Sequence, residues 1–225
     1  MIPPLIVRAA LEAGISIIAV TDHNATANIA AVQQAALGTS LLVLPGMEVQ
    51  TREEVHSLCL FSKVEMAYAF QAIVDASLPD IENQPEFFGE QFVVDKTGEF
   101  IRREERLLIT STSLSLEEAR RHVHALNGIF IPAHVNRKAF GLLENLGFVP
   151  SDLAPDALEV SRHLPVSQAA HDFPSLAGYP LVKGGDAHRL DELLGLNRFE
   201  LDHPSLSELR LALQNEAGRS LYVLE

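Results

Sequence analysis

The sequence has one cysteine and few positive charges: 17 lysine and arginine residues stand against 30 acidic residues in a chain of 225. The lone Cys59 excludes an internal disulfide and any zinc site built from several cysteines. Because it lies in an apolar run, we expect it to pack as a small hydrophobe. A net charge of −13 lacks the cationic footprint that holds extended nucleic acid, so we expect no such partner.

The sequence also lacks long hydrophobic runs. No run reaches the roughly 18 apolar residues of a membrane span. The start, Met1-Ile2-Pro3-Pro4, has no charged segment followed by an apolar stretch and a cleavage site, so it does not read as a signal peptide. We therefore expect no membrane partner and a cytoplasmic location.

The pattern that is present is an alternation of apolar β-rich runs and amphipathic helical stretches. Apolar residues make up 47% and charged residues 21%, which is typical of a globular chain. The expected strands are 15–20, 41–44, 55–61, 129–131, 157–160, 181–182 and 221–224, and the expected helices are 3–13, 26–36, 64–76, 115–126 and 205–215. This rhythm predicts one parallel α/β domain over residues 1–225, barrel-like or doubly wound.

Two features depart from the rhythm. Residues 79–106 begin polar and then offer two short strands around 95–98, so we interpret 79–114 as an inserted hairpin or cap, placed to lie over a site. The chain also opens with a helix, whereas an α/β barrel usually opens with a strand. Either the topology is unusual or a first strand is missing.

Metal-competent residues lie beside several of the predicted strands. The strand ends of an α/β barrel converge on one face, where the active site forms. A single histidine at a strand end is more often structural. Metal-competent residues at four separate strands favour a shared metal site instead. Asp186 and His188 are two residues apart, so their side chains would share one face of an extended segment. The mixed nitrogen and oxygen set suits Zn, Mn or Fe better than Ca or Mg. Its members are His23, Glu48, His56, His134, Asp186 and His188.

The ordered motifs TDHN, GMEVQTREEVH, PAHVNR and GGDAHR closely resemble the PHP (polymerase and histidinol phosphatase) family of metal-dependent phosphoesterases. The resemblance implies a distorted seven-stranded (β/α) barrel with one to three divalent metal ions. It also implies hydrolysis of phosphate esters of small molecules or nucleotides. The same six histidine and carboxylate residues match the family's ligand positions.

The chain departs from that family at its start, because no histidine precedes His23 and the usual His-x-His strand is absent. A misplaced start at an internal methionine and a natural truncation both explain this, and we favour the first. In the family pattern only Glu48, His56 and His134 form a ligand set that survives whole. We therefore expect one well-occupied metal there, and a weaker or absent one near Asp186, His23 and His188.

Four cationic or titratable residues near strand ends are candidates for substrate contact. Arg137 could grip a phosphate and assist catalysis, and Arg162 and Arg189 are further phosphate-binding candidates. His163 could act as an acid toward the leaving oxygen. The alternative for each is a solvated loop residue or a surface ion pair.

These observations predict an enzyme that hydrolyses a small phosphomonoester or nucleotide by metal-activated water, impaired if the first strand is lost. The alternatives are a non-catalytic metal- or phosphate-binding remnant and an amidohydrolase-like metal enzyme. A missing strand would expose a sheet edge and favour a homo-oligomer.

Overall fold

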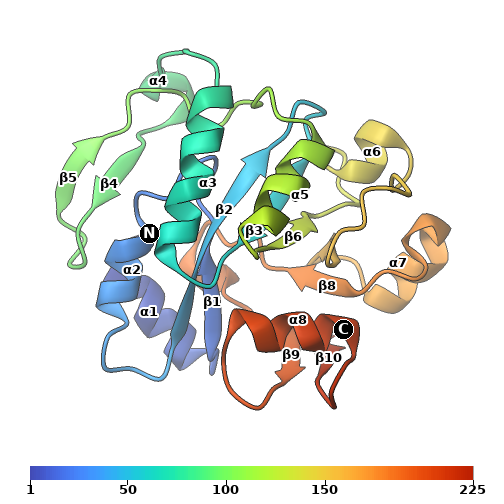
Figure 1. The fold of residues 1–225 in the computed structure, drawn as a ribbon. Helices are drawn as coiled ribbons and strands as arrows, with labels where there is room; N and C mark the ends of the chain where they lie inside the picture. The colour runs from blue at the N-terminus through green and yellow to red at the C-terminus, as the bar shows by residue number, and fades with distance from the viewer. Residues whose placement is uncertain (225) are drawn as a thin grey trace.

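A computed structural model describes residues 1–224 and shows a mixed α/β fold (Figure 1). Its strands are β1 Ile17–Val20, β2 Leu42–Gln50, β3 His56–Leu60, β4 Phe92–Val94, β5 Phe100–Arg103, β6 Ile129–Pro132, β7 Leu158–Ser161, β8 Leu181–Gly184, β9 Asn197–Glu200 and β10 Ser220–Val223. Its α-helices are α1 Pro3–Glu12, α2 Ile29–Ala35, α3 Val64–Ser77, α4 Pro85–Phe88, α5 Leu116–Ala125, α6 Leu142–Leu146, α7 Val166–Asp172 and α8 Leu206–Gln214. Two short 3₁₀ turns, Pro174–Leu176 and Leu190–Glu192, complete the elements.

The main sheet has four strands in the order β1-β2-β3-β6. β1 is parallel to β2, but β3 is antiparallel to both of its neighbours. Since β2 and β3 are joined by a short connection, no crossover helix separates them. The expectation of a purely parallel sheet is therefore wrong at β3.

The strands of residues 1–224 form no closed sheet, so the expected seven-stranded barrel is not seen. β7 and β8 pair in parallel with each other as a separate ladder. β6 and β7 form no ladder with each other, but backbone hydrogen bonds join their flanks, from Asp156 N to Phe130 O (3.0 Å) and from Val135 N to Glu159 O (2.8 Å).

Helix ends follow the signals in the sequence. α1 begins with Pro3 in its first turn, and Gly14 follows it with a φ of +70°. The predicted capping box at the start of α5 is confirmed, because Ser115 accepts the Glu118 N–H and Glu118 accepts the Ser115 N–H. Ser205 caps α8 through its side chain, which accepts the Glu208 N–H. β1 is shorter and less buried than predicted, because it forms an edge of the sheet.

Apolar layers cover both faces of the main sheet. One core packs α3 and α5 against the strands, with Phe61, Phe70 and Phe130 completely buried. A second core packs α8 against the other side through Leu206 and Leu209. Figure 1 shows α3 and α5 crossing in front of the sheet, with α8 below it. Packing on both faces holds the strands of the main sheet, and with them the strand ends where the predicted metal ligands lie.

Residues 79–114 contain α4 and the antiparallel hairpin of β4 and β5, as the two short strands predicted. Asn28 ties the hairpin to the segment before α2, donating to Phe92 O and accepting from Val94 N. Within residues 1–224, no helix has the length and apolar character needed to cross a membrane.

Candidate metal centre

The register of β2 and β3 places a carboxylate beside an imidazole. β2 runs on to Gln50, so Glu48 lies within the strand and not after it. Gln50 is paired with His56, the first residue of β3. Because β3 is antiparallel to β2, the start of β3 lies at the same end of the sheet as the end of β2. The reversal explains why His56, at a strand start, joins residues that follow other strands.

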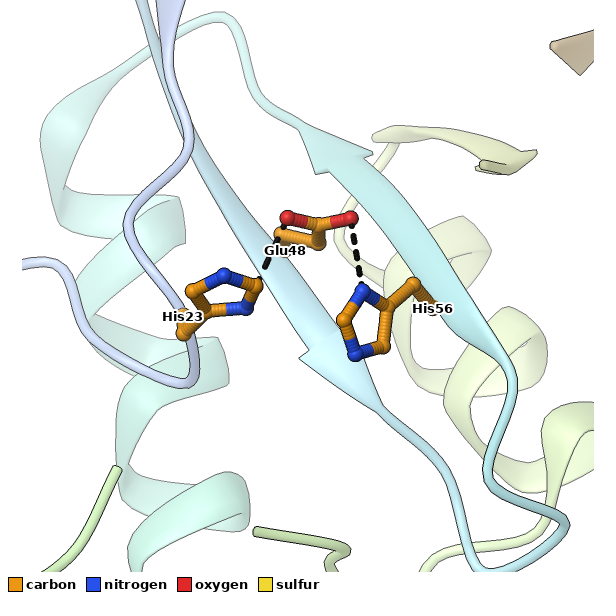
Figure 2. A group of neighbouring side chains, drawn as sticks. All are labelled: His23, Glu48 and His56. Carbon is orange, nitrogen blue, oxygen red and sulfur yellow. Dashed lines mark ion pairs between the residues drawn. The ribbon is translucent and has the colours of Figure 1, made fainter. Parts of the chain in front are cut away.

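His23 approaches the same carboxylate from the segment after β1. It forms an isolated parallel bridge with Glu48, and the Glu48 backbone is bonded on both sides of it, to Asp22 O and Asn24 N. Figure 2 shows the carboxylate of Glu48 lying between the rings of His23 and His56. Their ligand atoms all lie within 4.8 Å of one another, and in residues 1–224 this is the one such group of three.

The two oxygens of Glu48 face different histidines. Oε1 lies 3.1 Å from His56 Nδ1 and 3.4 Å from His134 Nε2, whereas Oε2 lies 3.5 Å from His23 Nδ1. Burial alone would raise the pKa of Glu48, but the hydrogen bonds from His134 and His56 outweigh it and hold this pKa far below its usual range. Burial lowers the pKa of His23, and Glu48 offsets this in part. The carboxylate is thus ionised beside a neutral imidazole.

His134 follows β6 in a left-handed backbone conformation, with φ +32°. Its side chain is buried, and its Nδ1 has no hydrogen-bond partner among the described residues. His56, which faces the same carboxylate oxygen, is held by the ring of Phe140, stacked at 4.4 Å, and by Gln50, whose Oε1 lies 3.4 Å from His56 Nε2. These two contacts fix the ring of His56 beside Glu48.

Asp186 and His188 lie at the margin of this group. Asp186 has a φ of +43°, so the segment after β8 is not extended as expected. The two side chains still meet, with His188 Nδ1 3.5 Å from Asp186 Oδ1. His188 is mostly exposed, and its ring centre lies 6.1 Å from that of His23. The carboxylate of Asp186 is also hydrogen-bonded to the guanidinium of Arg137.

A pocket of about 220 Å³ opens beside His134 and Asp186. Arg137, Arg162 and His163 are among its lining residues, and their role in substrate contact stays a prediction. Arg162 is held by Glu192 and by Gly185 O. The predicted Arg189 is not part of this lining; it is exposed, and its backbone N–H donates to Glu192.

Glu159 also lines the pocket, although the sequence reasoning did not select it. It lies within β7, is 7% exposed, and accepts the backbone N–H of His134. The signal for it was an acidic residue inside the predicted strand 157–160. Gln50 and Phe140 were missed as well, because only the folded chain shows that they touch His56.

The donor set fits a divalent metal ion. Two imidazoles and an ionised carboxylate converge, and metal binding requires neutral histidine and deprotonated carboxylate. The unpartnered Nδ1 of the buried His134 is a further nitrogen donor beside the group. The surviving set inferred from the family pattern had His134 with Glu48 and His56; the tightest three in the structure include His23 instead.

No family model matches the sequence, and no curated protein matches it. Solved structures do. The lesion-specific endonuclease Q of Pyrococcus furiosus aligns with a TM-score of 0.71 and 19% identity, over 98% of this chain and 53% of its own. An endonuclease Q complex with a 27-mer duplex, with an abasic lesion at the active site, aligns with a TM-score of 0.68, 18% identity and the same coverage. A protein of Bifidobacterium adolescentis assigned as a metal-dependent phosphoesterase gives 0.55 and 18%, over 84% and 82% of the two chains.

These likenesses show that the chain shares a mixed α/β fold with these structures, and residues 1–224 form no closed sheet. The chain spans about half the length of the endonuclease Q structures. The expectation that excluded extended nucleic acid as a partner is wrong. Endonuclease Q, whose structure aligns with 98% of this chain, holds a DNA duplex. Net charge is a sum over the whole chain and does not describe the surface around one site.

Proposed function

We propose that the chain is a metal-dependent hydrolase of phosphoric esters. The observation that carries this proposal is the cluster of His23, Glu48 and His56, whose ligand atoms all lie within 4.8 Å of one another, with His134 beside them. Nitrogen and carboxylate donors in this arrangement hold Zn, Mn or Fe. The likeness in fold to an endonuclease and to an assigned metal-dependent phosphoesterase supports the same chemical class.

In this proposal Glu48, His56 and His134 would hold one divalent ion, and Glu48 with His23 would hold a second. Asp186 and His188 are the further residues that would hold the second ion. When bound, the ions supply Lewis acidity that activates water and stabilises charge on phosphoryl oxygens.

The neighbouring pocket binds the ester. Arg137 and Arg162 present guanidinium groups that hold phosphate oxygens, and their ion pairs with Asp186 and Glu192 orient them. His163 is exposed at the rim and donates a proton to the leaving oxygen. The hairpin of residues 79–114 is assigned as an inserted cap of the single domain 1–225.

A specific observation favours DNA as the substrate. Both endonuclease Q structures align over 98% of this chain, and one of them holds a duplex with an abasic lesion at its active site. The sugar-phosphate backbone of DNA is a phosphodiester, which the same metal and arginine groups can bind. A small phosphomonoester is the alternative substrate.

The test is hydrolysis measured with added Zn²⁺ or Mn²⁺ on three substrates: nitrophenyl phosphate, bis-nitrophenyl phosphate and a duplex oligonucleotide with one abasic site. We expect cleavage of a phosphate ester that is abolished by chelator and by His56→Ala. Nitrophenyl acetate separates this reaction from amidohydrolase-like ester cleavage. Metal-dependent hydrolysis of the acetate alone would contradict the proposal, and metal binding without any hydrolysis would favour a non-catalytic module.

A further inference from the structure

Glu159 holds the segment that carries His134. Its Oε1 accepts the His134 N–H at 3.0 Å, and its backbone carbonyl accepts the Val135 N–H at 2.8 Å. On the other side, the Ala133 N–H donates to His56 O at 2.8 Å. Three successive amides are thus fixed between β3 and β7, around a residue whose φ is +32°. A residue other than glycine keeps this conformation only when its surroundings impose it.

The fold reserves space for this carboxylate. Ser161 of β7 is paired with Gly184 of β8, and a Cβ atom on Gly184 would lie 2.2 Å from Glu159 Cδ and within 2.5 Å of both of its oxygens. The carboxylate therefore occupies the place that a side chain of β8 would take. This close approach requires glycine at position 184 and confines the Glu159 side chain beside His134.

We propose that Glu159 is a positioning residue, which fixes the backbone of His134 and so aims its imidazole at Glu48. The inference rests on the metal site of the proposed function. Glu159 acts through its acceptor oxygen and its shape, because the bond that it makes to this segment is to a backbone amide. Residues that orient metal ligands in this way set metal affinity without touching the ion.

Two substitutions separate this role from that of a ligand. Glu159→Ala removes the acceptor, and we expect it to weaken metal binding by about 10–100-fold. Glu159→Gln keeps an oxygen acceptor of the same shape, so it should retain most of the affinity. A residue that bound the ion through its charge would lose affinity in both variants.

A third substitution, in β8, tests Glu159 indirectly. Gly184→Ala leaves every polar group of the site in place but forces the Glu159 carboxylate to move. We expect it to weaken metal binding in the native background and to have little further effect in Glu159→Ala. That pattern would mark Gly184 and Glu159 as acting on one another.

The experiment measures the dissociation constant for Zn²⁺ by competition with a chromophoric chelator, on the full chain, with folding checked by circular dichroism. Val160→Ala is the matched control, because Val160 is a fully buried neighbour in β7 that packs in the core. It should lower stability without changing zinc affinity.

The proposal is overturned if Glu159→Ala binds zinc as the wild type does, or if Glu159→Gln loses as much affinity as Glu159→Ala. A wild type that binds no zinc would overturn this proposal and the metal site together. A wild type that binds zinc but cleaves no phosphate ester would contradict only the proposed function. Zinc affinity and hydrolysis therefore report separately on the two proposals.

Discussion

Nδ1 of His56 lies 3.1 Å from Oε1 of Glu48, on a strand that runs antiparallel to the one that carries Glu48. The seven residues between them include the turn that reverses the chain. This local reversal brings the two groups together without a crossover helix. The more distant His23 and His134 then reach the same carboxylate from the segments after β1 and β6.

Glu48→Gln should remove the group on which the metal site is centred. The charge of the carboxylate balances the ion, and both of its oxygens face histidines. We expect zinc affinity to fall by about tenfold or more, measured as metal content per chain by mass spectrometry after dialysis. The control is His171→Ala, since this histidine is largely exposed and pairs with Asp172. Equal metal content in Glu48→Gln and wild type would contradict the site.

Ser115→Ala should destabilise the fold through α5. Ser115 Oγ accepts the Glu118 N–H at 3.1 Å, and α5 buries Leu116 and Val123 against the sheet. We expect the free energy of unfolding to fall by about 1 kcal/mol, measured by urea denaturation. Ser113→Ala, at a nearby exposed serine, should cause little change. A loss of the same size in both variants would contradict a role for the cap.

Local signals in the sequence predicted much of the fold. The capping box at Ser115 and the proline start of α1 act over a few residues, so they can be read directly. The run of residues 55–61 also predicted a strand, but an apolar pattern carries no strand direction. The antiparallel course of β3 and the missing ladder between β6 and β7 depend on long-range pairing, which is why the expected seven-stranded barrel is not seen among residues 1–224.

The candidate site could be anticipated only in its charged and histidine residues. His23, Glu48 and His56 stand out as a type of residue that binds metals, and the structure brings them together. Glu159 could not be assigned, because its role depends on contacts with His134 and Gly184 from two other strands. The net charge of −13 led to the wrong exclusion of nucleic acid, since a net charge averages over surfaces that are far apart.

Asp156→Asn should destabilise the joint between α5, β6 and α8. The buried carboxylate accepts the Phe130 N–H at 2.8 Å, contacts His124 Nε2 at 2.7 Å, and lies 3.4 Å from Arg210. Burial raises the pKa of Asp156, but these hydrogen bonds and charges outweigh it and lower the pKa below its usual 3.8. At pH 7 we expect a loss of about 1–3 kcal/mol in the free energy of unfolding.

The pH dependence of that loss has a definite sign. A depressed pKa stabilises the fold above pH 3.8, and this contribution disappears as the pH falls through the lowered value. The difference between wild type and Asp156→Asn should therefore be constant near neutral pH and shrink below about pH 3.8. Urea denaturation from pH 7 to pH 3 measures it. A difference that grows on acidification would contradict the assigned ionisation.

Glu159 should give the metal-free protein the opposite pH dependence. Burial, followed by repulsion from Glu48 and Asp186, raises the pKa of Glu159 to about 8 against the His134 hydrogen bond that lowers it. The folded chain then keeps a proton that the unfolded chain loses near pH 4.5, the ordinary value for this carboxyl. The folded state binds more protons in this window, so this group makes the free energy of unfolding fall as the pH rises from about 4.5 to about 8.

Glu159→Gln has no proton to lose, so its stability relative to the wild type should rise across that window and level off above it. The measurement is urea denaturation of both proteins in excess chelator at several pH values from 4.5 to 9. A metal ion near Glu48 would counter the repulsion on Glu159, so added zinc should reduce the slope in the wild type and leave the variant little changed. Parallel pH profiles for the two metal-free proteins would show that Glu159 is ionised in the folded chain at neutral pH.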